Sequence, residues 1–144
     1  MATSVFKSLV DTTYDSVEGY RKMAEKADNP QLQQQLQQRA QSREQVLQQM
    51  NAELERQGDE LVTKGTLTGE MHQMYASITD AFRDGDKVAA DRIEEGEDYI
   101  KGKFSEALDS DQLEASERSV VQSAYDDICR GERFSDRVES QQTY

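Results

Sequence analysis

Apolar and small side chains recur every three or four residues along most of this chain, and that spacing is its strongest structural constraint. In the first segment the line consists of Phe6, Val10, Thr13, Val17, Tyr20, Ala24 and Ala27. This period keeps one face of an α-helix turned inward, whereas a strand would show a period of two. The sequence contains a single proline, so little interrupts the pattern. We therefore expect an all-α fold built from long helices.

Short clusters of turn-forming residues divide this pattern into separate helices. Asn29 is the predicted N-cap of the second helix, with Pro30 in its first turn, and Gly58 is predicted to end that helix. Glu114 follows Asp111 at the spacing of a capping box. The helices are predicted over residues 3–27, 30–57, 67–83, 86–108 and 112–139.

The lengths of the connections predict how these helices are joined. A tight turn joins the first two helices, another joins the last two, and a long crossover with its own helix over 67–83 links the two hairpins. This connection pattern is typical of ferritin-like four-helix bundles rather than of simple up-down-up-down bundles. With 144 residues, we expect one domain over 1–144.

Charge and the lack of long apolar runs exclude several kinds of partner. The chain has 29 acidic and 17 basic residues, a net charge of −12, which repels phosphate backbones and anionic lipid surfaces. No apolar stretch is long enough for a membrane span, and the start of the chain lacks the pattern of a signal peptide. We expect a cytoplasmic protein with no nucleic-acid or membrane partner. The single cysteine, Cys129, excludes an internal disulfide and is interpreted as half-buried and inert.

Three segments together resemble a known family. They are DSVEGYRKMAEKADNPQL, RAQSREQVLQQM and EEGEDYIKGKFSEAL. With their order and loop positions, they resemble the bacterial ferritin-like, rubrerythrin-related four-helix-bundle domains of unknown function, over nearly the whole chain. The resemblance implies a di-iron site in the bundle core. Its ligands would be one carboxylate from each of the first and fourth helices and a Glu-x-x-His from each of the other two long helices.

Only part of that ligand set is present. In rubrerythrin-like helices the ligand carboxylate precedes an aromatic residue by seven positions. Glu97 fits this rule in the fourth helix, seven residues before Phe104, but Thr13 stands seven residues before Tyr20 in the first. The sequence therefore supplies one of these two carboxylates.

The histidine ligands are missing as well. At the corresponding place in the second helix the sequence has Arg43 followed by Val46, and residues 122–127 contain no histidine. The only histidine of the chain, His72, falls in the connecting helix and is interpreted as an ordinary helix residue. We expect a degenerate di-iron site and no bound cofactor.

Charged residues on the inward helix faces suggest what replaces the metal. Arg43, Glu97 and Asp127 lie on these lines, and burying such charges singly costs several kcal/mol unless they are paired. We predict a core polar network of Thr13, Arg43, Glu97 and Asp127, in which the guanidinium supplies the positive charge that iron otherwise brings. Two alternatives stay open at this point: the side chains extend to solvent, or a residual metal site persists.

The residual metal site has its own candidate ligands. Glu18 and Glu44 lie one position from the inward lines and would bind a metal together with Glu94 and Glu97. Such oxygen ligands suit a single Mg²⁺, Ca²⁺ or Mn²⁺. The alternative is that these carboxylates are solvated on an acidic surface.

These observations predict a non-enzymatic helical protein that acts through its surface, as a homodimer or other homo-oligomer. The helix over 67–83, with Met71, Met74, Tyr75, Ile78 and Phe82, is predicted to cover the bundle or to form a dimer contact. A role in stress or envelope adaptation is implied by the resemblance alone. The competing class is a metal-dependent oxidoreductase or iron-handling protein that binds Fe or Mn.

Overall fold

A computed structural model describes residues 1–65 and 70–130 of the chain. In these residues the secondary structure consists of helices, and no strand is present. The helices are α1 (Ser4–Lys26), α2 (Pro30–Arg56), α3 (Glu70–Ala81), α4 (Asp86–Asp109) and α5 (Ala115–Arg130), with a short 3-10 turn over Phe82–Asp84 between α3 and α4. The predicted all-α fold is therefore confirmed for the described residues.

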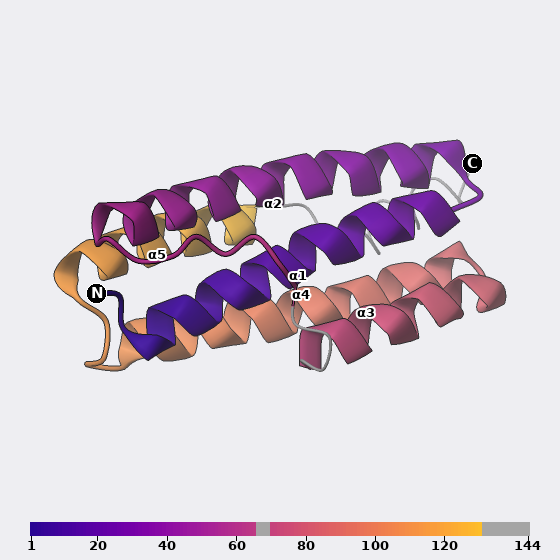
Figure 1. The fold of residues 1–144 in the computed structure, drawn as a ribbon. Helices are drawn as coiled ribbons and strands as arrows, with labels where there is room; N and C mark the ends of the chain where they lie inside the picture. The colour runs from indigo at the N-terminus through magenta and orange to yellow at the C-terminus, as the bar shows by residue number, and fades with distance from the viewer. Residues whose placement is uncertain (66–69, 131–144) are drawn as a thin grey trace.

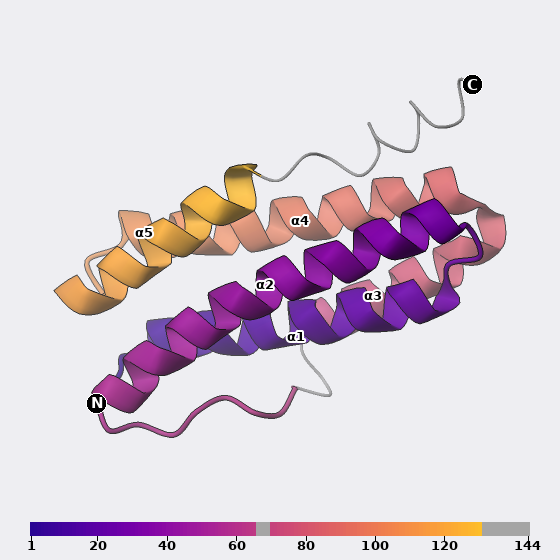
Figure 2. The same ribbon diagram turned by 90° about the horizontal axis from the view of Figure 1, so that it is seen from above.

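The long helices lie side by side, and neighbouring ones run in opposite directions (Figure 1, Figure 2). α1 and α2 form one hairpin, and α4 and α5 form the other. The crossover after α2 runs back along the bundle, so α4 starts at the same end as α2 and runs parallel to it. α1 packs against α2, α3 and α4, while α5 packs against α2 and α4.

The turn residues explain where α2 begins and ends. The Asn29 side chain accepts hydrogen bonds from the amides of Gln31 (2.9 Å) and Leu32 (3.3 Å), as expected for an N-cap before Pro30. At the other end Gly58 has a φ of +76°, a left-handed conformation that favours glycine, and the Asp59 amide bonds back to the Leu54 carbonyl. α2 therefore begins at the predicted residue, Pro30, and ends at Arg56, one residue before the predicted end.

The start of α5 differs from the prediction. The helix begins at Ala115 rather than at residue 112, and the capping carboxylate belongs to Glu117, which accepts a bond from the Glu114 amide at 3.0 Å. Glu114 and Glu117 therefore hold the positions before the helix and in its first turn, three residues later than the predicted Asp111–Glu114 pair. The predicted end of this helix at residue 139 and the predicted start of the connecting helix at residue 67 lie outside the described residues.

The apolar core has two parts, one towards each end of the bundle. The first contains Phe6, Val10, Met50, Leu54, Phe104 and Val121, and includes residues of α5. The second contains Tyr20, Met23, Leu32, Leu36, Ile78 and Ile93, and includes α3. On α2 the boundary falls between Ala40 and Val46, and on α4 it falls between Ile93 and Ile100. Arg43 and Glu97 occupy this boundary.

α3 packs against α1 and α4. Its Ile78 is 1% exposed and its Ala81 is buried, so this helix closes the second core cluster. The side chains of Met71, His72, Met74 and Tyr75 lie outside the described part. Within the described residues no helix is sufficiently long and apolar to cross a membrane.

Candidate functional site

An arginine–glutamate pair lies at the middle of the bundle, between the two core clusters. The Nη2 atom of Arg43 on α2 is 2.9 Å from Oε1 and 2.8 Å from Oε2 of Glu97 on α4. The two residues are each about 2% exposed. A charge-assisted contact in which one nitrogen meets both carboxylate oxygens is stronger than a neutral hydrogen bond. The predicted Arg43–Glu97 pairing is present in the structure.

Side chains from α1 and α2 complete the surroundings of this pair. The fully buried Tyr20 donates its phenol proton to Oε1 of Glu97, and the Arg43 guanidinium carbon lies 5.6 Å from the centre of the Tyr20 ring. Nη1 of Arg43 donates to Ser16 at 2.6 Å, and Nη1 of Arg39 reaches Oε2 of Glu97 at 3.3 Å. We call Ser16, Tyr20, Arg39, Arg43 and Glu97 the central network. It connects α1, α2 and α4.

The electrostatic balance of the network keeps Glu97 ionised. Burial by itself raises the pKa of the Glu97 carboxyl, because a charged group is poorly solvated in the core. The charge and hydrogen bonds of Arg43, with smaller effects of Arg39 and Tyr20, outweigh burial and hold the pKa below its ordinary value. The pair is therefore a true ion pair at neutral pH.

Two other residues predicted for this network lie elsewhere. Asp127 is exposed and forms an ion pair with Arg130 on its own helix, so its predicted place in the core is wrong. The inward line through α5 passes instead through Val121, Ala124 and Ile128, one helix position further on. Thr13 is fully buried, but its hydroxyl donates to the Leu9 carbonyl at 2.8 Å and lies 3.5 Å from the Met50 sulfur.

The four glutamates of the alternative metal site are not brought together. Glu18 accepts a hydrogen bond from the Tyr14 phenol (3.2 Å), and Glu44 pairs with Arg21 at 2.6 Å near the surface. Glu94 is buried, and Glu97 belongs to the central network. Among the side chains that the structure describes, no group of three or more His, Cys, Asp or Glu is arranged to hold a metal ion.

The residues of the bundle centre do not fit the di-iron site that the family resemblance implies. Iron needs several carboxylate and imidazole donors, whereas the Glu97 carboxylate is already bonded by two guanidinium groups. Thr13 presents a hydroxyl in place of the second carboxylate, and Arg43 presents a cation, which repels a metal ion. These residues therefore do not form an iron site at this place.

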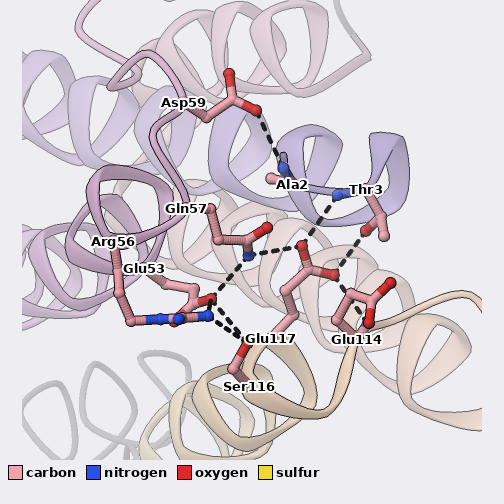
Figure 3. Close-up of polar contacts among 9 residues, drawn as sticks. All are labelled: Ala2, Thr3, Glu53, Arg56, Gln57, Asp59, Glu114, Ser116 and Glu117. Carbon is pink, nitrogen blue, oxygen red and sulfur yellow. Dashed lines mark hydrogen bonds and ion pairs between the residues drawn. The ribbon is translucent and has the colours of Figure 1, made fainter.

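A second buried polar cluster, at the end of the bundle where α1 and α5 begin, was not predicted (Figure 3). Its centre is the fully buried carboxylate of Glu117. This carboxylate accepts bonds from the Thr3 amide (3.0 Å), the Thr3 hydroxyl (2.8 Å), the Gln57 side chain (3.0 Å) and the Glu114 amide (3.0 Å). Burial raises the pKa of Glu117, but these bonds outweigh it and the pKa lies below its ordinary value.

Glu53 extends this cluster across the end of α2. Its carboxylate is bound by Arg56 (2.7 and 2.9 Å), by Gln57 (2.7 Å) and by the Ser116 hydroxyl (2.9 Å). The bond from Arg56 is the main cause that lowers the pKa of Glu53 to about 2. Burial opposes it, and the bonds from Gln57 and Ser116 act in the same direction as the bond from Arg56. We call Thr3, Glu53, Gln57, Ser116 and Glu117 the junction cluster.

Sequence signals for these missed residues exist but are weak. Glu117 lies on the inward line of its helix. A charge at such a position needs a partner, as the charge of Arg43 does. The role of Tyr20 as a donor to Glu97 is not visible in the sequence, since a buried tyrosine most often serves packing. Cys129 is exposed rather than half-buried, which corrects its predicted position.

Fold and site together define an all-α protein whose core contains a paired charge network. A family model described as a domain of unknown function, DUF2383, matches residues 1–110, and the chain belongs to this family. The match includes α1 to α4 and therefore every residue of the central network. Searches of curated proteins and of solved structures find no significant match.

Proposed function

We propose that this protein is a non-enzymatic helical bundle of the ferritin-like class that acts through self-association or protein partners. Its bundle centre is closed by the Arg43–Glu97 pair at the place where metal-binding relatives would hold iron. The observation that carries the proposal is this buried pair, in which one guanidinium nitrogen contacts both oxygens of the Glu97 carboxylate.

The helix directions support the ferritin-like part of the proposal. Ferritin-like bundles contain two hairpins linked by one long crossover, which makes the second and third long helices parallel. α2 and α4 have this parallel relation, and α3 lies in the crossover (Figure 1). The second hairpin is completed by α5, which contacts both α2 and α4.

The charges at the centre support a role without metal chemistry. A guanidinium stays protonated at every physiological pH, so Arg43 provides a permanent cation for Glu97. The carboxylate needs no metal to be neutralised, and Arg39 adds a second positive charge at 3.3 Å. The cavity beside Arg39 and Arg43 has a volume of about 110 Å³, well below that of a typical ligand pocket, and Arg43 and Glu97 are each about 2% exposed.

The outer face of α2 supports a role for the surface. It carries exposed glutamine side chains at Gln31, Gln34, Gln37, Gln38, Gln41, Gln45, Gln48 and Gln49. Amides offer hydrogen-bond donors and acceptors without charge. This face therefore does not add to the electrostatic repulsion that the net charge of −12 creates towards an acidic partner. The face is continuous along one helix and is available for contacts with a second protein.

Metal analysis separates the proposal from its alternative, a metal-dependent oxidoreductase or iron-handling protein. The protein would be produced in medium supplemented with iron and manganese and then measured by elemental mass spectrometry. The proposal predicts substoichiometric metal and a melting temperature that a chelator leaves unchanged. Near-stoichiometric iron or manganese, with a chelator-induced loss of stability, would favour the alternative.

Sedimentation velocity over a wide range of protein concentration tests self-association. We expect the sedimentation coefficient to rise with concentration towards that of a dimer or larger oligomer. A constant monomer value would reject self-association and leave protein partners as the remaining route. Substituting Gln38, Gln41 and Gln45 by Glu would weaken an interface on the outer face of α2, whereas the same change at Gln112 would not.

A further inference from the structure

The hairpin of α1 and α2 carries a surface groove, and part of the crossover lies in its first half (Figure 1, Figure 2). We call this part, residues 59–65, the strap. Its Asp59 forms an ion pair with Lys7 at 2.9 Å, and a Cβ at Gly65 would lie 2.8 Å from the Asp15 carboxylate oxygen. The strap therefore follows α1 from near its start to its middle.

α2 holds the strap by its main chain. The Asn51 side chain accepts a hydrogen bond from the Val62 amide at 2.9 Å and donates one to the Val62 carbonyl at 3.1 Å. One side-chain amide thus satisfies both main-chain groups of one strap residue, because it carries a donor and an acceptor. This mode of binding requires a non-helical main chain and no particular side chain at residue 62.

The groove continues past the strap along the same two helix faces. On α1 the residues beside it, at steps of three or four, are Lys7, Asp11, Tyr14, Glu18, Arg21 and Glu25. On α2 they are Gln33, Gln37, Gln41, Glu44 and Asn51. Residues at these spacings share one face of a helix. The second half of the groove, lined from Arg21 and Glu44 onwards, has a volume of about 460 Å³.

The second half presents the kind of group that holds the strap in the first. Gln37 and Gln41 are exposed and carry side-chain amides, as Asn51 does. Ala24 and Ala40, each 4% exposed, lie between the two helices at the base of the groove. Because these side chains are small, a main chain can approach the helices closely and reach the two glutamine amides.

The length and charge of the second half define its occupant. From Gln33 to Glu44, α2 rises about 17 Å, the length of about five residues of extended chain. The lining has one arginine, Arg21, and two glutamates, Glu25 and Glu44, which favours a cationic side chain on the occupant. A second copy of this chain, with its net charge of −12, brings no excess of positive charge to the groove.

We propose that the second half of the α1–α2 groove binds an extended, basic peptide segment of a partner protein. Gln37 and Gln41 hold its main chain as Asn51 holds that of Val62, and Glu25 and Glu44 select a positive side chain. The inference rests on the proposed action through protein partners and names the form that such a partner presents.

NMR titration of the nitrogen-15-labelled full-length protein with a defined probe tests the groove. The probe is a seven-residue peptide of threonine and alanine with one central lysine and blocked ends, a composition that favours an extended chain. We expect the amide signals of the residues lining the groove to shift, with a dissociation constant below about 1 mM. The double variant Gln37→Ala/Gln41→Ala should bind the probe about tenfold more weakly or worse.

Two matched controls separate main-chain recognition from general attraction to an acidic surface. Gln38→Ala/Gln45→Ala changes two exposed glutamines of the same helix that do not line the groove, so the affinity should stay within about twofold of the wild type. A probe with methylated main-chain nitrogens keeps the lysine but lacks the main-chain donors, and it should bind about tenfold more weakly.

Three results would overturn the proposal: no shift in the groove at about 1 mM probe, equal weakening in the two double variants, or undiminished binding of the methylated probe. Shifts of the same signals that follow protein concentration without any probe would assign the groove to a second copy, which also contradicts it. Rejection of the groove leaves the proposed function standing or falling on its own metal and sedimentation measurements.

Discussion

Arg43 and Glu97 meet across the middle of the bundle, with Nη2 of the arginine 2.8 Å and 2.9 Å from the two carboxylate oxygens. They occupy the boundary between two apolar clusters, and Tyr20 joins them from α1. Together with Tyr20, this pair connects α1, α2 and α4 and so fixes how these three helices align. Polar groups in cores stabilise one arrangement chiefly by penalising every arrangement that leaves them unpaired.

Arg43→Met should lower the free energy of unfolding by about 3 kcal/mol or more, because it leaves the Glu97 charge buried without its main partner. Urea denaturation followed by circular dichroism measures this. Arg21→Met is the control, since Arg21 pairs with Glu44 near the surface and should lose less than about 1 kcal/mol. Equal losses in the two variants would contradict a buried ion pair.

Tyr20→Phe should cost about 1–2 kcal/mol, because it removes one phenol donor from a buried carboxylate and leaves the ring in place. Tyr14→Phe removes the bond to Glu18, which lies on a partly exposed part of α1, and should change stability much less. Thermal unfolding of the two variants under identical conditions gives the comparison. A larger loss in Tyr14→Phe would show that the phenol of Tyr20 is not a significant partner of Glu97.

Acid should destabilise the protein through the junction cluster. The pKa of Glu53 is lowered from 4.5 to about 2 in the folded state, and that of Glu117 is also lowered. Since the unfolded chain then binds more protons in this range, the stability from these groups is present above about pH 4.5 and is lost as the pH falls towards 2. Urea denaturation at a series of pH values measures the slope.

Glu53→Gln provides the control for this pH dependence. The variant should be less stable than the wild type at neutral pH and should lose less stability on acidification, because its side chain has no proton to bind. Identical slopes below pH 4.5 in the two proteins would show that Glu53 does not carry the effect.

The sequence predicts the helices well because their determinants are local. Asn29 before Pro30 and Gly58 after the apolar line act through bonds within a few residues, and both boundaries lie within one residue of where the pattern places them. The pairing of Arg43 with Glu97 was also predictable, because each residue occupies the inward face of its own helix and neither charge is stable alone in a core.

The other features depend on how each helix is rotated about its own axis and how it packs against its neighbours. A rotation of one position on α5 moves Asp127 to the surface and makes Ile128 a core residue, and helical spacing alone does not determine such a small angle. The junction cluster joins Thr3, Gln57 and Glu117, whose nearness arises only from tertiary packing. Glu117 lies on the inward line of α5, but nothing local in the sequence indicates which donors would satisfy it.

Gly65 and Gly102 should respond in opposite ways to alanine. A Cβ at Gly65 in the crossover would lie 2.8 Å from the Asp15 carboxylate oxygen on α1, too close for contact, whereas a Cβ at Gly102 on α4 meets nothing within 4 Å. Because the atom in question is the end of a side chain, Gly65→Ala should cost about 1 kcal/mol or less by displacing the Asp15 carboxylate, whereas Gly102→Ala should stabilise the helix by up to about 1 kcal/mol. Thermal unfolding checks both, and a stabilising Gly65→Ala would contradict the close approach of the crossover to Asp15.

A double-mutant cycle between Arg43→Met and Glu97→Gln, measured by urea denaturation, tests the closed, charge-paired centre most directly. We predict that the double variant is more stable than the sum of the two single losses implies, with a coupling of about 2 kcal/mol or more, because each single change strands the other partner. Additive losses, with a coupling close to zero, would contradict the account.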